Sequence, residues 1–126
     1  MREILFRGQR VDNGQWVHGD LHKDRYFVNA HIHPIGERIV SFKVIPQTVG
    51  QYTGLDDANG KKIFEGDICM MKLSDGFEKV TIEWSKENFR FFVKEEDGEL
   101  YGFDSTAEFE VIGNIYDKVE VENDNK

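Results

Sequence analysis

Residues 49–69 read VGQYTGLDDANGKKIFEGDIC, and this stretch decides the fold. Its Asn59-Gly60 dipeptide readily adopts the positive φ angles needed at both centres of a type I′ hairpin turn. Two aspartates precede the turn, and their side chains can hydrogen-bond the backbone two residues further on. A short apolar strand follows at 61–64, and Gly66 then lets the chain bend into a second apolar run. The stretch therefore predicts antiparallel strands joined by tight turns.

Short apolar and aromatic runs continue in both directions from this stretch, with turn residues between them. Aromatic and β-branched residues favour strands, and near-regular spacing favours a barrel or sandwich over a βαβ arrangement. The predicted fold class is all-β with at most one short helical turn. That turn is expected at Ser105–Glu108, where Ser105 could cap it and Glu108 could close a capping box. Further strands are expected at 4–10, 16–22, 26–32, 39–45, 67–73, 80–84, 89–93, 100–103 and 110–116, with a bulge or close backbone approach at Gly113.

Pro46 marks the expected boundary between two subdomains, because proline cannot donate a hydrogen bond to a sheet ladder. The charge also changes at this point. Residues 1–45 carry seven Lys or Arg and five Asp or Glu, which gives +2, whereas residues 46–126 carry nine and nineteen, which gives −10. The predicted organisation is an N-terminal β subdomain, a second β subdomain and an acidic flexible tail, over residues 1–46, 47–118 and 119–126 respectively.

Three further blocks carry a recognisable pattern, namely REILFRG at 2–8, DNGQWVHG at 12–19 and EVIGNIY at 110–116. Together with residues 49–69, these blocks resemble the YopX family, small proteins found mostly in bacterial phages and prophages. The middle of the chain and the strands after Met71 match only as a hydrophobic pattern. The resemblance implies a C-terminal half similar to a small SH3-like β-barrel behind an N-terminal antiparallel β subdomain. It implies no established activity.

The composition is that of a compact globular chain. Its 126 residues are 39% hydrophobic, and a chain of this size buries about two-thirds of its unfolded surface. No apolar run reaches the roughly 18 residues of a membrane span, and charges interrupt the apolar N-terminus, so neither a span nor a signal peptide is expected. Cys69, the single cysteine, is expected to be a small buried hydrophobe in a reducing compartment. The expected location is the cytoplasm of a phage-infected or prophage-carrying bacterium.

The four histidines all lie within the first 33 residues, as His18, His22, His31 and His33. Positions i and i+2 of a strand project to one face, so His31 and His33 could reach one metal ion together. A third ligand would have to come from His18 or His22 on a neighbouring strand. Histidines on an exposed strand face are more often solvated, and the sequence does not decide whether the four come together. No metal and no cofactor are predicted.

Two groups of acidic residues are candidate sites. A calcium loop with Gly60 at its sixth position would place Leu55 first and Gly66 twelfth, and neither can coordinate the ion. A carboxylate cluster could instead serve acid–base or magnesium chemistry, built from Glu65 and Asp67 with Asp56, Asp57 and Glu83 nearby. The structural interpretation is favoured, because an aspartate at a strand entrance can accept hydrogen bonds from backbone N–H groups. No catalytic residue is predicted, and the chain is predicted not to be an enzyme.

Aromatic side chains are the remaining candidates for a binding surface. Alternation predicts that Phe89 and Phe91 share one face of a strand while Phe92 takes the other. Most of the aromatic residues in the second subdomain are expected to fill its core. SH3-like barrels often bind peptides or nucleic acids through exposed aromatics, so the candidate binding residues are Tyr52, Trp84, Phe89, Phe91, Phe92 and Tyr101.

The predicted function is a non-enzymatic protein-interaction module with an unknown protein partner. A second hypothesis is a nucleic-acid accessory protein, although the acidic half repels phosphate. Its basic and aromatic face would consist of Arg2, Arg7, Arg10, Lys23 and Arg25 with Trp16, Tyr26 and Phe27. An acidic protein that imitates DNA and a metal-dependent hydrolase are further hypotheses. Homo-oligomerisation stays open, because strand edges must be covered or paired.

Overall fold

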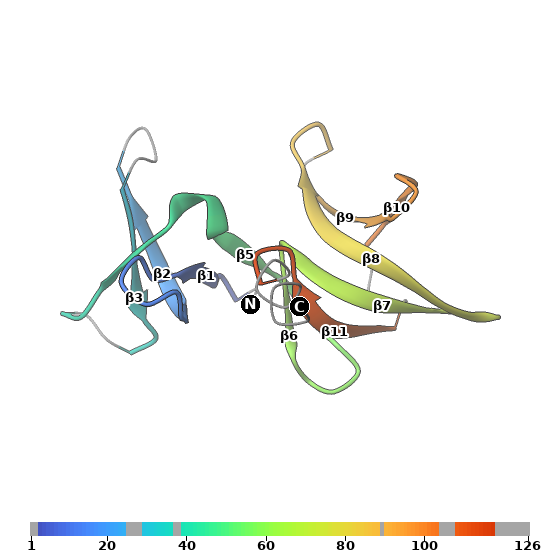
Figure 1. Cartoon of the computed structure of the whole chain (residues 1–126), viewed down its shortest axis with the longest axis horizontal. Coiled ribbons are helices and arrows are strands. Elements are labelled where there is room, and N and C mark those ends of the chain that lie inside the picture. Colours follow the sequence, from blue (N-terminus) through green and yellow to red (C-terminus); the bar gives the residue numbers. More distant parts are fainter. Residues whose placement is uncertain (1–2, 25–28, 37–38, 89, 104–107, 118–126) are drawn as a thin grey trace, which may run out of the picture. The chain divides into compact units, whose positions relative to one another are not determined.

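The computed structural model describes residues 3–24, 29–36, 39–88, 90–103 and 108–117 (Figure 1). The described residues are all-β, as predicted, with two antiparallel sheets and one 3-10 turn. No helix in these ranges is long and apolar enough to cross a membrane. The chain divides into two compact units, Met1–Gly54 and Leu55–Lys126.

The first unit holds β1 to β4 and most of β5, which belong to a six-stranded sheet with the order β4-β3-β2-β1-β5-β6. Strand β5 pairs with β1 through Gln51 opposite Phe6 and Gly50 opposite Arg7. Because of this pairing, the chain beyond Pro46 still belongs to the first sheet, and the boundary falls at Gly54 instead. The elements are β1 (Phe6–Gln9), β2 (Trp16–Lys23), β3 (Ala30–Pro34), β4 (Phe42–Val44), the 3-10 turn η1 (Pro46–Thr48) and β5 (Gly50–Asp56), which runs on into the second unit.

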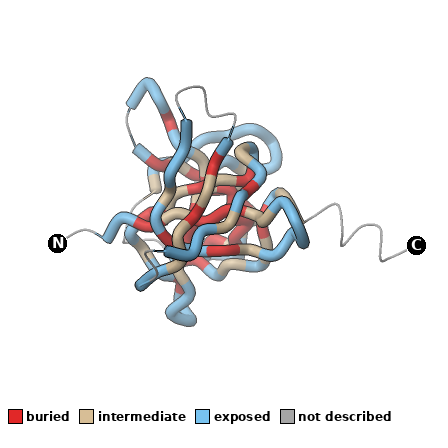
Figure 2. The backbone as a smooth tube through the Cα atoms, turned by 90° about the vertical axis from the view of Figure 1, so that its left-hand side faces the viewer, coloured by how far each residue is buried: buried red, intermediate tan, exposed pale blue. Residues whose placement is uncertain are grey.

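The core of the first unit lies on one face of its sheet. Buried residues alternate with exposed or half-buried ones along β2 and β3, as the period of a strand requires. Figure 2 colours the backbone by the burial of each residue. The buried cluster consists of Val17, Ala30, Ile32 and Val44, and Phe6, Leu21, Phe42 and Val49 pack against it.

The second unit contains a five-stranded sheet with the order β10-β9-β8-β7-β11. Strand β6 (Lys62–Phe64) lies next to β5. Within the described ranges, no ladder joins the two outer strands, so the sheet order is open and a closed SH3-like barrel is not confirmed. The remaining strands are β7 (Asp67–Leu73), β8 (Gly76–Ser85), β9 (Arg90–Glu95), β10 (Leu100–Gly102) and β11 (Phe109–Asn114).

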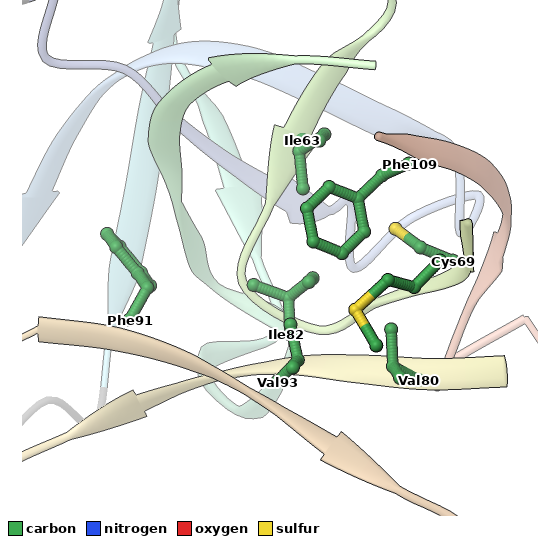
Figure 3. Close-up of a cluster of buried hydrophobic side chains, with 8 residues drawn as sticks. Ile63, Cys69, Val80, Ile82, Phe91, Val93 and Phe109 are labelled. Carbon is green, nitrogen blue, oxygen red and sulfur yellow. The ribbon is translucent and has the colours of Figure 1, made fainter. Parts of the chain in front are cut away.

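The core of the second unit gathers side chains from β6 to β9 and from β11. Figure 3 shows the Phe109 ring turned toward Ile63 and Cys69, with side chains of β8 and β9 below them. Cys69 is fully buried, so the prediction of a small buried hydrophobe is confirmed. The cluster consists of Ile63, Cys69, Met71, Val80, Ile82, Phe91, Val93 and Phe109.

The predicted hairpin between β5 and β6 is present, but its turn differs from type I′. The Asp57 N–H donates to the Lys61 carbonyl at 2.7 Å, and the Gly60 N–H donates to the Asp57 carbonyl at 3.0 Å. The loop therefore has three residues, and Gly60 takes a φ of 84°. The Ala58 N–H, which a two-residue turn would pair across the hairpin, donates instead to the Phe109 carbonyl at 2.9 Å. A tertiary partner has overridden the local preference.

Several predicted elements shift or fall outside the described ranges. The strand expected at 39–45 covers only Phe42–Val44, and Ile39 is 95% exposed. The strand expected at 26–32 is seen from Ala30 onward. The bulge expected at Gly113 is confirmed by a register shift between Val111 and Gly113. The helical turn at 105–108 and the tail at 119–126 lie outside the described residues.

Candidate functional site

The four histidines lie on one face of the first sheet. In the register of β2 and β3, His22 stands opposite His31, and Asp20 stands opposite His33. His18 stands opposite Arg7 on β1. Directly opposite residues project to the same face, and so do residues two apart, so the register joins all four histidines into one surface. This face is the one opposite the Val17 and Ile32 core.

A shared face does not by itself make a metal centre, because the ligands must also converge on one point. Nowhere in the described ranges do three His, Cys, Asp or Glu side chains converge closely enough to hold a metal ion. Partial burial, and then the positive charge of Arg7, lower the pKa of His18. This position therefore disfavours a charged imidazole. The expected alignment of His31 with His33 is present, but it supplies no third ligand.

The basic and aromatic face predicted for nucleic acid is divided between the two sides of the sheet. Arg7 is buried, and its guanidinium lies 4.7 Å from the centre of the Trp16 ring. Arg10 lies 4.1 Å from the centre of the Phe42 ring and pairs with Asp12 at 2.6 Å. Residues three apart on a strand project to opposite faces. The two arginines consequently do not form one phosphate-binding surface, and Arg2, Arg25, Tyr26 and Phe27 lie outside the described residues.

The acidic candidates separate into structural and surface residues. Asp57 is buried, and its carboxylate accepts backbone N–H groups of Asn59 at 2.9 Å, Lys61 at 2.8 Å and Val111 at 3.0 Å. Burial alone would raise the pKa of Asp57, but these hydrogen bonds and the charge of Lys61 outweigh it and lower the pKa. A carboxylate held as an anion in this way is a backbone cap rather than a proton carrier. Asp56 is exposed.

Asp67 has the role predicted for it. Its Oδ2 atom accepts the Phe64 N–H at 2.8 Å, and the residue is almost fully buried at the entrance to β7. Glu65 and Glu83 are the two acidic candidates that reach a common surface, because both line a groove on the second unit.

This groove on the second unit has a volume of about 680 Å³. Strand β8 contributes Lys79, Thr81 and Glu83, which alternate with the buried Val80 and Ile82. An ion pair at 3.5 Å joins the ammonium of Lys79 to the Glu96 carboxylate. The lining residues are Glu65, Gly66, Ile68, Lys79, Thr81, Ile82, Glu83, Trp84, Lys94, Glu95, Glu96, Ile115 and Tyr116.

The sequence contains a signal for this groove in the polar residues of β8, but the prediction of a binding surface considered only aromatic residues. Polar residues at alternate positions of β8 mark the face of the strand that does not enter the core. The candidate aromatic residues differ in burial and in the strand face that they occupy. Phe91 is buried and meets Trp84 edge to face at 4.9 Å between ring centres, while Phe92 is half-buried on the other face, as predicted. Tyr52 is buried, and Phe89 lies outside the described residues.

Comparison with family models gives a match to the YopX protein model over residues 5–121. That match covers most of the chain and includes both units. The chain belongs to the YopX family. A comparison with curated proteins gives no match.

The fold of this YopX-family chain also has a solved counterpart. The crystal structure of protein EF1440 from Enterococcus faecalis is similar with a TM-score of 0.61 and 23% sequence identity. The similarity covers 96% of this chain and 99% of that protein. At this identity the likeness concerns the fold alone.

Proposed function

We propose that this YopX-family protein is a non-enzymatic protein-interaction module of a phage or prophage that works in the bacterial cytoplasm. The groove on the outer face of the second unit carries the proposal. Sites for small molecules are mostly apolar with a few polar groups, whereas charged residues make up much of this lining. A lining of mixed charge and apolar surface suits a segment of another protein.

The apolar contribution comes from Ile68, Trp84 and Ile115. Ile68 is buried beneath the groove, while Ile115 keeps 42% of its surface exposed. Covering an exposed branched side chain beside a hollow is favourable, because the partner removes apolar surface from water. Ile115 and Trp84, the exposed members of this set, supply the surface that a partner would bury.

The charged contribution comes from the lysines and glutamates that line the groove. The side chains of Lys79 and Glu96 remain exposed even though they pair. Such a solvated ion pair adds little to stability, and ion pairs with charged residues of a partner can replace it. By contrast, the buried acidic residues Asp57 and Asp67 are engaged with backbone N–H groups. The proposal therefore assigns the groove to recognition and assigns no reaction to the acidic residues.

The experiment compares two exposed isoleucines in a pull-down. Ile115→Glu places a charge in the groove, and Ile112→Glu places the same charge on β11, where Ile112 is 51% exposed and is not among the groove residues. The full chain and both variants are immobilised, exposed to a lysate of phage-infected bacteria and analysed by quantitative mass spectrometry. We expect one protein in stoichiometric amount with the parent chain and with Ile112→Glu, and its loss with Ile115→Glu. Equal recovery by all three chains, or recovery of chaperones alone, would contradict the proposal.

A further inference from the structure

The two ends of the five-stranded sheet differ in how their outward backbone groups are satisfied. At one end, β11 is covered by the turn between β5 and β6. The Phe109 carbonyl accepts the Ala58 N–H at 2.9 Å, and the Val111 N–H donates to the Asp57 carboxylate at 3.0 Å. These two groups of β11 therefore have partners, and the turn covers this part of the edge.

At the other end, β10 pairs with β9 through Tyr101 opposite Val93. The Glu95 N–H donates to the Glu99 carbonyl at 2.9 Å in the connecting hairpin. Hydrogen-bonded and non-hydrogen-bonded pairs alternate along an antiparallel ladder, so the backbone groups of Leu100 and Gly102 point away from β9. In the part of the chain that the structure describes, no strand lies on that side.

The side chains of β10 leave this edge accessible. All three residues are exposed, with Leu100 at 59% and Tyr101 at 45%. Gly102 has no side chain of its own, and the Arg90 guanidinium lies 3.4 Å from the position that its Cβ would take. An edge strand with exposed apolar side chains is a template for strand addition, in which backbone hydrogen bonds give affinity and alternate side chains give selectivity.

Carboxylates outnumber cationic side chains around this edge, where Lys94 stands opposite Leu100 and the Arg90 guanidinium lies beside Gly102. The charge of Glu95, then partial burial, then the charges of Glu99, Asp97 and Glu78 raise the pKa of Tyr101. Burial and the same neighbours raise the pKa of Glu95. A second copy of the chain would bring an identical set of carboxylates to the edge and be repelled. A strand that carries lysine or arginine would neutralise them.

We propose that the β10 edge binds an extended, basic segment of a partner protein as an added strand. The inference rests on the proposed function only in that the chain acts by binding protein. It names the chemical class of the partner and a second surface, the β10 edge, which shares Glu95 with the groove.

The test uses two short synthetic peptides and the full chain. One peptide alternates lysine with valine, and the other alternates glutamate with valine. Binding is followed by fluorescence polarisation and mapped by amide chemical shifts. We expect saturable binding of the basic peptide that weakens with salt, shift changes centred on β10, and no binding of the acidic peptide.

Two substitutions at one position separate the backbone contribution from the side chain. Leu100→Pro removes an outward N–H while sparing the bonds between β10 and β9, and Leu100→Ala trims the side chain while keeping that N–H. We expect Leu100→Pro to bind the basic peptide several-fold more weakly than Leu100→Ala, up to about tenfold. Unchanged unfolding temperatures would show that both variants are folded.

Three results would overturn the inference. They are equal affinity of the two Leu100 variants, equal binding of both peptides, and shift changes confined to the groove. Self-association through β10 in sedimentation would also contradict it, because the occupant would then be a second copy. The proposed function is tested separately by the Ile115 and Ile112 variants, since a partner recovered through the groove can survive failure at β10.

Discussion

The carboxylate of Asp57 accepts the backbone N–H of Val111 at 3.0 Å, which joins two residues 54 positions apart in the sequence. The same carboxylate also holds the hairpin turn through Asn59 and Lys61. One side chain thus fixes a local turn and ties it to the outer edge of β11. The stability of the second unit should depend on it.

Asp57→Asn should destabilise the protein by about 1–3 kcal/mol, because the amide replaces one acceptor oxygen of a buried side chain with a donor and leaves a backbone N–H without its acceptor. The free energy of unfolding is measured with urea. Asp75→Asn is the matched control, since Asp75 is exposed in the turn between β7 and β8. An equal loss of unfolding free energy in both variants would show that the buried acceptor does not stabilise the protein.

The effect of Asp57 should depend on pH. Its pKa in the folded protein lies below the ordinary value of 3.8. A lowered pKa gives stability that is present above 3.8 and is lost as the pH falls through the folded-state pKa. The difference in unfolding free energy between the parent chain and Asp57→Asn should therefore be largest above pH 4 and narrow in acid. Urea unfolding from pH 7 to pH 3 checks this, and a difference that stays constant would contradict it.

Gly19→Ala should destabilise the first unit, because a Cβ atom at this position would lie 1.9 Å from the carbonyl oxygen of His33 and 3.0 Å from the Pro34 Cα. Strands β2 and β3 would have to move apart, at a cost of about 1–3 kcal/mol. Hydrogen exchange of the β2 and β3 amides and urea unfolding measure the effect. Gly113→Ala is the control, since nothing lies within 4 Å of its Cβ position. Similar behaviour of the two variants would refute the steric argument.

The sequence predicted what depends on local rules. Period-two alternation placed His31 and His33 on one face and separated Phe91 from Phe92. The glycine-hinged bend predicted that Asp67 would accept a backbone N–H. These features follow from neighbours in the chain, so no knowledge of strand order was needed.

Features that depend on register and strand order could not be predicted. The histidine face needed the pairing of His22 with His31, which only the alignment of β2 with β3 supplies. The prediction of a type I′ turn was wrong because the Ala58 N–H donates to the carbonyl of Phe109, a residue far along the chain. Predicting the groove required knowing that Lys79 and Lys94 lie on paired strands, because each lysine alone resembles an ordinary surface residue.

Glu95→Gln should stabilise the protein at pH 7. Burial, followed by the charges of Glu78, Asp97 and Glu99, raises the pKa of Glu95 above its ordinary 4.5. A raised pKa means that the folded state favours the neutral acid, so stability is lost as the pH rises through the folded-state value. The uncharged amide avoids this loss. Its unfolding temperature should exceed that of the parent chain at pH 7, and the advantage should shrink near pH 4 and in high salt.

Glu95→Gln also tests whether the charges that destabilise the free protein contribute to binding. Glu110→Gln removes an exposed charge from β11 and is the control. If carboxylates at β10 recruit a basic strand, Glu95→Gln should raise the unfolding temperature and weaken binding of the lysine–valine peptide, whereas Glu110→Gln should do neither. Charge crowded at a surface costs stability in the free protein and is relieved when a cationic partner arrives. Stabilisation with undiminished peptide affinity would show that the charges around β10 have no role in recognition.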